Sequence, residues 1–198
     1  MKFGKNLRNE ITEKLPEWEG EFISYKYLKK QLNLIAPPWH DEETKRPRKR
    51  PRMATDNCLV MEERNTNHTG EETGFIQLLR DDFEKINLFC DDKEAEYVNR
   101  LKELRDEVAV LEGSGGNATQ VIRDLLDFHR EMVLLLRYGV LNLEGLLKIV
   151  KKHKKKTGSF VLSPFMLRVL QQPFFSTDLL HKLLRECEAT LRQLLLPI

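Results

Sequence analysis

A run of lysines between residues 148 and 156 is the strongest chemical signal in this sequence. On a helix, Lys148, Lys151, Lys152 and Lys155 fall within an arc of about 100°, at positions i, i+3, i+4 and i+7. Like charges at that spacing repel by a few tenths of a kcal/mol per pair, so this lysine stripe is costly unless a polyanion occupies it. The segment taken alone favours a solvated helix end, whose lysines suit the helix dipole. Four residues fall on the opposite face and can meet a core: Leu146, Ile149, Val150 and His153.

A second basic group lies in the first 30 residues and could complete a pocket with the stripe. Three lysines share one face of a short helix that the apolar spacing predicts from Phe22. An aromatic residue precedes them, and two more lysines stand at the chain start: Tyr25, Lys26, Lys29, Lys30, Lys2 and Lys5. If the two basic surfaces meet, the pocket suits a compact, highly phosphorylated ligand better than a single phosphate. Lysines act as point charges toward many phosphates, whereas arginines read one group bidentately.

The remaining polar clusters give no positive sign of catalysis or metal binding. The five histidines have no metal-ligand spacing, and we expect each to be structural or exposed: His40, His68, His129, His153 and His181. Acidic residues between positions 71 and 92 lie amid lysines on a predicted helix, which indicates a solvated face. No Gly-rich phosphate loop, GxSxG or HExxH motif is present. We therefore expect a protein that is not an enzyme and has no cofactor.

Composition indicates a soluble protein inside the cell. The net charge is only +2 although 32% of the 198 residues are charged, so the distribution of charge says more than its sum. The three cysteines are far apart, which favours a reducing compartment. No apolar run approaches the roughly 20 residues of a membrane span, and the N-terminus has no apolar signal segment. The basic run 45–52 resembles a nuclear localisation signal or a nucleic-acid tether, with a solvated linker as the alternative. We expect the nucleus and the cytoplasm.

Helical periodicity predicts an all-α fold of one domain over residues 1–198, with no strand. Two short helices separated at Pro16 occupy residues 1–35 and are followed by a disordered basic linker over residues 36–73. Apolar residues from Ile76 to Leu111 then step by threes and fours, which predicts one helix of about 35–40 residues.

The chain reverses at the glycine-rich stretch 113–117, and the same apolar step carries a second long helix from Val121 to Thr157. The two long helices are therefore antiparallel. The lysine stripe lies at the end away from the glycine turn, beside the start of the first long helix. A short helix over 164–171 and a last helix capped near residues 176–178 complete the expected fold.

Five motifs, in order along nearly the whole chain, resemble those of an SPX domain, most closely the stand-alone SPX proteins of plants: Met1-Lys-Phe-Gly-Lys5, Leu15-Pro-Glu-Trp18, Phe22-Ile-Ser-Tyr-Lys-Tyr-Leu-Lys-Lys30, Lys148-Ile-Val-Lys-Lys-His-Lys-Lys-Lys-Thr-Gly158 and Leu170-Gln-Gln-Pro-Phe-Phe175. The resemblance implies an N-terminal helical hairpin packed on a bundle built around two long antiparallel helices, with short C-terminal helices. It also implies a basic surface that binds inositol polyphosphates, such as inositol hexakisphosphate, and inositol pyrophosphates as reporters of cellular phosphate.

The resemblance also assigns roles by position. It places Tyr25, Lys29 and Lys152 in the phosphate-binding cluster of the family. It places three further lysines in the surrounding lysine surface, with a fourth nearby: Lys148, Lys151, Lys155 and Lys2. In plant stand-alone members the liganded domain captures MYB-type phosphate-starvation transcription factors, which carry a coiled coil, and keeps them from DNA. We expect such a partner and no direct DNA binding.

Two positions depart from the family pattern. Asn142-Leu-Glu-Gly145 stands where Asn-Tyr-Thr-Gly is usual, which removes an aromatic residue and adds a carboxylate, and Lys154 replaces the usual Asp. Neither falls on a matched ligand position. Ligand recognition should therefore survive both, while ligand preference and the geometry of the partner surface are open to change.

Other functions are compatible with the same residues. The lysines could bind nucleic acid or an anionic membrane electrostatically, although no stacking aromatic residues interleave with them between 148 and 156. The chain could also be the regulatory domain of a larger phosphate transporter or polyphosphate-synthesising enzyme. Its glycine-rich hinge would allow a homodimer that exchanges helices.

Overall fold

The computed structural model describes residues 3–35, 70–114, 116–158 and 176–196, and these residues form helices and short connections without any strand. In chain order the elements are α1 (Phe3–Lys14), the 3-10 helix η1 (Pro16–Glu21), α2 (Tyr25–Leu34), α3 (Gly70–Ser114), α4 (Thr119–Thr157) and α6 (Asp178–Leu195). The predicted all-α fold is confirmed. Lys2, the basic run 45–52 and the short helix predicted over 164–171 lie outside the described residues. No helix within the described ranges is long and apolar enough to cross a membrane.

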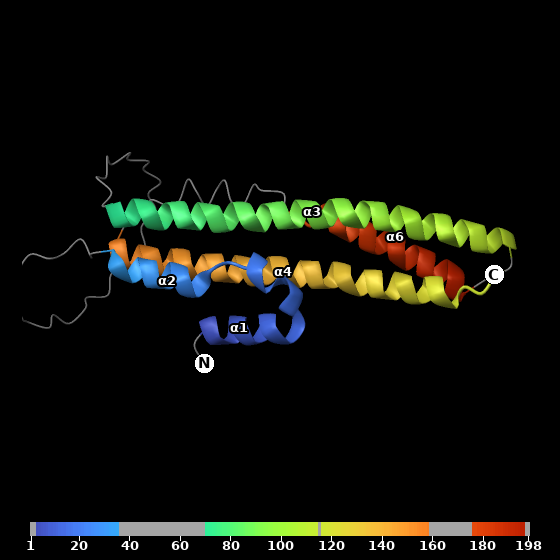
Figure 1. Ribbon diagram of the computed structural model, residues 1–198, viewed down its shortest axis with the longest axis horizontal. Helices are drawn as coiled ribbons and strands as arrows, with labels where there is room; N and C mark the ends of the chain where they lie inside the picture. The colour runs from blue at the N-terminus through green and yellow to red at the C-terminus, as the bar shows by residue number, and fades with distance from the viewer. Residues whose placement is uncertain (1–2, 36–69, 115, 159–175, 197–198) are drawn as a thin grey trace, which may run out of the picture.

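Helices α3 and α4 lie antiparallel and give the molecule its elongated shape (Figure 1). They contain 45 and 39 residues, so each is about 60–70 Å long at 1.5 Å per residue. The predicted reversal between them is confirmed. Asn117 closes the turn, because its Oδ1 accepts hydrogen bonds from the backbone N–H and the hydroxyl of Thr119, at 2.9 and 2.6 Å.

Helix α3 begins earlier than the sequence predicts. Residues 70–73, which we assigned to the linker, are helical. Glu71 and Glu72 in the first turn suit the positive end of the helix dipole. Glu72 and Phe75 also contact His153 on α4. Tertiary contacts thus support helical turns that the apolar periodicity does not mark.

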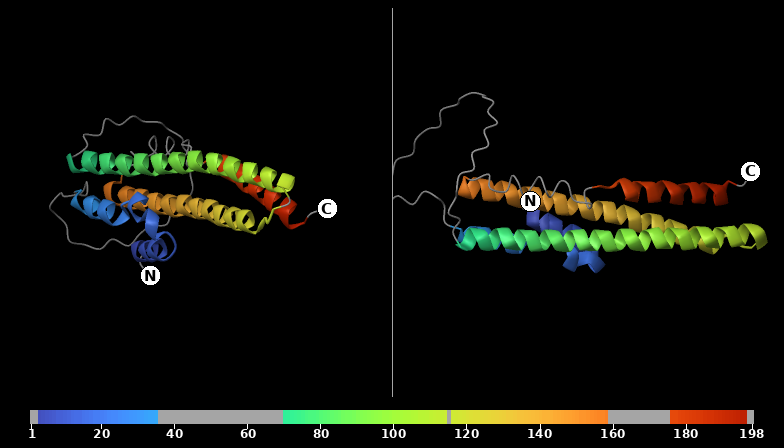
Figure 2. Two further views of the ribbon diagram at one scale, coloured as in Figure 1. Left: turned by 45° about the vertical axis from the view of Figure 1, so that its right-hand side comes forward. Right: turned by 90° about the horizontal axis from the view of Figure 1, so that it is seen from above.

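The core is the seam between α3 and α4, which α6 covers near the turn (Figure 2). Apolar side chains at the predicted heptad positions are buried: Leu79, Ile86, Cys90, Tyr97, Leu101, Leu104 and Val108 on α3, and Val121, Leu125, Phe128, Met132 and Leu135 on α4. Ile76, Phe83 and Leu111 were predicted in the same seam but are only partly buried, and Phe75 fills the core at the start of α3.

Helix α6 contributes a third buried face. Its Cys187 is fully buried and its thiol lies 3.5 Å from the carbonyl oxygen of Leu125 on α4. The helix begins at Asp178, close to the predicted cap, but Thr177 at the N-cap position makes no side-chain capping hydrogen bond. Burial of its apolar face, rather than a side-chain cap, therefore anchors this helix.

The first described segment, residues 3–35, packs against the half of the bundle away from the turn, where α2 lies beside the C-terminal part of α4 (Figure 1). Pro16 lies in the first turn of η1, two residues after α1 ends at Lys14, because a proline ring cannot donate a helical hydrogen bond. The second helix begins at Tyr25 and not at Phe22 as predicted, since Phe22 is extended with φ −72° and ψ 159°.

Residues 22–24 connect η1 to α2, and α3 holds this connection and the end of η1 from one side. Asp82 accepts two hydrogen bonds from Ser24, from the backbone N–H at 2.7 Å and from the hydroxyl at 3.0 Å. The Lys85 ammonium donates to the backbone carbonyls of Gly20, at 3.0 Å, and Phe22, at 2.8 Å. The backbone that leads into α2 is therefore tied to α3 by side chains from two successive positions of one helix face.

Helix α4 holds the same connection from the other side. The backbone N–H of Ile23 donates to the Asn142 side-chain oxygen at 2.9 Å, and the Tyr138 hydroxyl donates to the carbonyl of Glu21 at 2.8 Å. Gly145 allows the close approach, because a Cβ at this position would lie 2.8 Å from the Cγ2 methyl of Ile23. The start of α2 is fixed relative to α4 by these contacts.

Candidate functional site

A basic groove with a volume of about 770 Å³ opens between α1, α2 and the C-terminal part of α4. Its lining contains eight lysine or arginine side chains and no carboxylate: Phe3, Gly4, Lys5, Arg8, Tyr25, Lys26, Lys29, Lys148, Lys151, Lys152 and Lys155. Two N-terminal helices and the distant end of α4 thus bring cationic side chains to one surface. Such a concentration of positive charge needs an anion to balance it.

The structure brings the predicted site residues together. Six of the seven line this groove: Tyr25, Lys29, Lys148, Lys151, Lys152 and Lys155. The seventh, Lys2, lies outside the described residues. The two basic surfaces that the sequence placed on separate helices therefore meet, as the pocket hypothesis required.

Helix α4 aims the lysine stripe outward because its opposite face is anchored in the core. Ile149 and His153 are fully buried. The His153 ring stacks on Phe75 of α3, with centroids 5.2 Å apart and planes 10° apart, and its Nε2 lies 3.1 Å from Glu72 Oε1. The helix ends at Gly158, whose left-handed φ of 70° suits a glycine and whose N–H donates to the Lys154 carbonyl at 2.9 Å.

Phe3 joins the three helices at one edge of the groove. The Lys148 ammonium lies 3.8 Å from the centroid of the Phe3 ring, a cation–π contact. The Phe3 ring in turn meets the Tyr25 ring edge to face, with centroids 4.9 Å apart. Gly4 keeps α1 close to α2, because a Cβ there would lie 3.2 Å from Tyr25 Cδ1.

Tyr25 supplies the one phenol of the groove. Its side chain is largely buried, and this burial raises its pKa above the usual value. The hydroxyl therefore stays protonated at neutral pH, so it can donate a hydrogen bond to an anion beside the lysines.

Glu144 is the carboxylate nearest to a stripe lysine along α4. Its Oε2 lies 3.5 Å from the Lys148 ammonium, one helical turn further on. Both side chains are about half exposed. The carboxylate that the sequence marks as a departure from the family motif therefore touches a residue of the groove.

Some groove residues were missed from the sequence. Lys5 and Lys26 were recognised as basic but not placed in the site, and Phe3 and Arg8 were not considered at all. The spacing of Lys5 and Arg8, three residues apart on α1, is a signal that could have found the basic face of this helix. Lys30, which the sequence groups with Lys26 and Lys29, does not line the groove but lines an adjoining hollow between α1, η1 and α2, which Lys26 also lines.

Lys156 has a structural contact of its own. Its ammonium donates a 2.7 Å hydrogen bond to the carbonyl of Asn33 in the last turn of α2. This contact ties the ends of α2 and α4 together, which no feature of the stripe pattern indicates.

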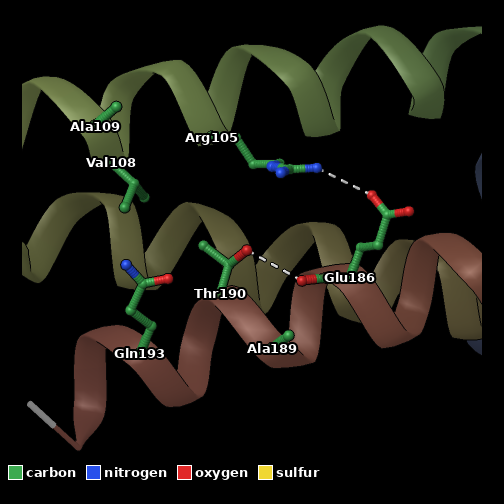
Figure 3. A pocket seen from close by; sticks show the side chains of 7 residues that line it. All are labelled: Arg105, Val108, Ala109, Glu186, Ala189, Thr190 and Gln193. Atoms are coloured by element: carbon green, nitrogen blue, oxygen red, sulfur yellow. Dashed lines mark hydrogen bonds and ion pairs between the residues drawn. The ribbon is translucent and has the colours of Figure 1, made fainter. Parts of the chain in front are cut away.

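Another hollow, of about 340 Å³, lies between α3 and α6 and is chemically different (Figure 3). Its two charged side chains, Arg105 and Glu186, pair with each other at 3.2 Å, and the Thr190 hydroxyl bonds the Glu186 carbonyl at 3.0 Å. Within the described part of the chain, no group of three or more histidine, cysteine or acidic side chains could hold a metal ion. The basic groove is therefore the candidate site.

Comparisons with known proteins agree with the sequence resemblance. Residues 1–57 match the SPX domain family. SPX domain-containing protein 2 of Arabidopsis thaliana is 47% identical over 98% of this chain and 66% of its own length, and SPX domain-containing protein 1 of the same plant is 46% identical over 98% of this chain and 71% of its own length. SPX domain-containing protein 1 of rice, Oryza sativa, is 49% identical over 98% of this chain and 66% of its own length.

The fold has a solved counterpart. The SPX domain of glycerophosphodiester phosphodiesterase 1 from Chaetomium thermophilum, determined in complex with inositol hexakisphosphate, superposes with a TM-score of 0.68 at 25% identity, over 96% of this chain and 97% of that one. The chain spans about two thirds of the length of its plant relatives. Sequence and fold together place this chain in the SPX domain family.

Proposed function

We propose that the basic groove binds inositol polyphosphates, including inositol pyrophosphates, and that the protein uses this binding to sense cellular phosphate. The observation that carries the proposal is the convergence of eight cationic side chains from α1, α2 and α4 without a carboxylate in the lining. A compact ring bearing several phosphates matches this arrangement, because each ammonium can contact a different phosphate. Support also comes from the similar SPX domain of Chaetomium thermophilum, which was solved with inositol hexakisphosphate.

We assign the roles within the groove from the family resemblance, and the meeting of these residues in one groove supports the assignment. Tyr25 donates a neutral hydroxyl and, with Lys29 on the same helix and Lys152 on α4, grips one phosphate. Lys148, Lys151 and Lys155, with Lys2, supply the surrounding positive field. A ligand held in this way bridges α2 and α4, so it stabilises the docked arrangement of the N-terminal segment over any loosened one.

Calorimetric titration with inositol hexakisphosphate tests the proposal. The wild-type protein should bind one ligand per chain, and Lys152→Ala should weaken binding about tenfold or more, since a hydrogen bond to a charged group is worth about 1.5–3 kcal/mol. The matched control is Lys102→Ala, an exposed lysine of α3 that does not line the groove, and it should bind like the wild type. Equal affinities of the Lys152→Ala and wild-type proteins would refute the assignment.

A milder substitution separates the phenol from the lysines. Tyr25→Phe removes only the hydroxyl and should weaken binding by about 1 kcal/mol, or about fivefold, the typical worth of one hydrogen bond. Wild-type affinity in this variant would remove the Tyr25 hydroxyl from the site.

A non-specific polyanion binder would behave differently in the same titration. Its affinity would grow with the length of a nucleic acid or polyphosphate, and no stoichiometry of one small ligand per chain would appear. A binder of that kind would also respond to Lys102→Ala about as strongly as to Lys152→Ala.

We further propose that the liganded protein captures a MYB-type phosphate-starvation transcription factor through the coiled coil of that factor, in the nucleus and the cytoplasm. This assignment is supported by the match to plant proteins over 98% of the chain. Titration of a MYB coiled-coil peptide with and without inositol hexakisphosphate tests it, since binding should require the ligand. Ligand-independent binding, or none, would leave a regulatory SPX domain of a larger transporter or polyphosphate-synthesising enzyme as the better proposal.

A further inference from the structure

Glu144 holds one lysine of the groove before any ligand arrives. Its carboxylate lies 3.5 Å from the Lys148 ammonium across one turn of α4. Within the described ranges, Lys148 is the only cation of the groove that has a carboxylate partner. The same ammonium lies 3.8 Å from the Phe3 ring centroid. Lys148 is thus engaged twice, whereas Lys151, Lys152 and Lys155 face solvent.

A phosphate that binds Lys148 must compete with this carboxylate. The ammonium has three N–H groups, so it can keep its aromatic contact while it exchanges an anionic partner. After the exchange the Glu144 carboxylate stays within one helical turn of the lysine and therefore close to the bound phosphates, which it repels. Both the lost ion pair and the new repulsion oppose binding.

We propose that Glu144 lowers the affinity of the groove for inositol polyphosphates, because it pairs with Lys148 in the free protein. The inference rests on the proposed function of the groove. It assigns a role to a side chain that lies outside the groove lining. The magnitude is moderate, because an exposed pair spaced i, i+4 contributes little by itself and the repulsion from several phosphates adds to it.

The test removes the negative charge of the Glu144 side chain and keeps its size and shape. Glu144→Gln should bind inositol hexakisphosphate about three- to tenfold more tightly than the wild type at about 50 mM salt, and this gain should shrink at about 0.3 M salt because screening weakens the repulsion. The matched control is Glu107→Gln on the far part of α3, which is exposed and lies outside the groove. It should leave the affinity unchanged.

A double-mutant cycle identifies the mechanism. In a Lys148→Ala background, Glu144→Gln should give a clearly smaller gain than in the wild-type background, because the ion pair is already absent and only the repulsion of the phosphates is relieved. A gain in affinity as large as in the wild-type background would show that Glu144 acts only as a general surface charge. That result would overturn the proposal that Glu144 acts through its pair with Lys148.

The failure of this inference can be told apart from the failure of the proposed function. If Glu144→Gln binds like the wild type while Lys152→Ala loses affinity, Glu144 has no such role and the groove remains the ligand site. If the wild-type protein does not bind inositol hexakisphosphate, both proposals fail. Circular dichroism before titration confirms that each variant keeps its helical content.

Discussion

The contact between Gly145 and Ile23 predicts that Gly145→Ala destabilises the protein, although alanine is the better helix former. A Cβ at position 145 would lie 2.8 Å from Ile23 Cγ2, whereas carbon atoms in contact are normally about 3.5–4.0 Å apart. Ile23 cannot yield easily, because it is buried and its N–H is bonded to the Asn142 side chain. The next residue, Ser24, is bonded twice to Asp82.

Two opposing effects fix the expected magnitude. Overpacking a buried contact costs about 1–3 kcal/mol, while replacing glycine by alanine inside a helix gains about 1 kcal/mol. Gly145→Ala should therefore lower the free energy of unfolding by about 0–2 kcal/mol. Gly139→Ala is the matched control, since it lies in the same helix and a Cβ there would meet nothing within 4 Å. It should gain up to about 1 kcal/mol.

Urea denaturation followed by circular dichroism measures the difference between the two variants. Gly139→Ala should be more stable than Gly145→Ala by about 1–3 kcal/mol, equivalent to about 2–12 °C in Tm for a chain of this size. In an Ile23→Ala background the penalty at position 145 should largely disappear, because the clashing methyl is gone. Equal stability of the two single variants would refute the argument that α4 and the connection touch at Gly145.

The pKa shifts give two further predictions. The hydrogen bond from Arg137 lowers the pKa of Glu10 below its usual value, so this exposed pair stabilises the fold above a pH of about 4.5 and loses that effect as the pH falls further. Glu10→Gln should be less stable than the wild type at pH 7, by less than about 1 kcal/mol, and this difference should shrink as the pH is lowered below about 4.5. Urea titrations over this pH range measure the difference, and a difference that stays constant with pH would exclude the pair as its cause. Burial raises the pKa of the Cys90 thiol to about 12 and that of the Cys187 thiol to about 11. In a folded Cys58→Ser variant, neither thiol should react with Ellman's reagent at pH 8, and both should react once the protein is unfolded. Rapid reaction of the folded variant would contradict the burial of these thiols.

Regular features of the fold could be predicted because they repeat along the sequence. The heptad steps of α3 and α4 mark most of the buried seam, and the glycine-rich stretch marks the reversal between the helices. The antiparallel arrangement then follows, and it places the lysine stripe beside the start of α3. The start of α3 itself was misplaced, since residues 70–73 are polar and become helical beside contacts that Glu72 and Phe75 make with His153.

The contacts that position the groove could not be predicted in the same way. Asn142 binds Ile23 across 119 residues of sequence, and Asp82 binds Ser24 across 58. A lone asparagine on an apolar helix face carries no information about its distant partner. The contact of Phe3 with Lys148 is equally remote, so the lysines of the site were found from their own spacing and the aromatic residue beside them was missed.

The position of Phe3 has a practical consequence for handling the protein. The third residue of the chain contacts Lys148 at the edge of the groove, while α6 ends at Leu195 near the opposite end of the two long helices (Figure 1). A purification tag, dye or fusion partner joined just before α1 would therefore lie beside the basic groove, where we expect its bulk and charge to alter the binding of an anion. The same group joined after α6 is separated from the groove by much of the length of α4, a helix that is about 60 Å long. A label joined after α6 is thus the better choice for binding assays, and fluorophores before α1 and after α6 would report on the N-terminal segment and on the bundle separately.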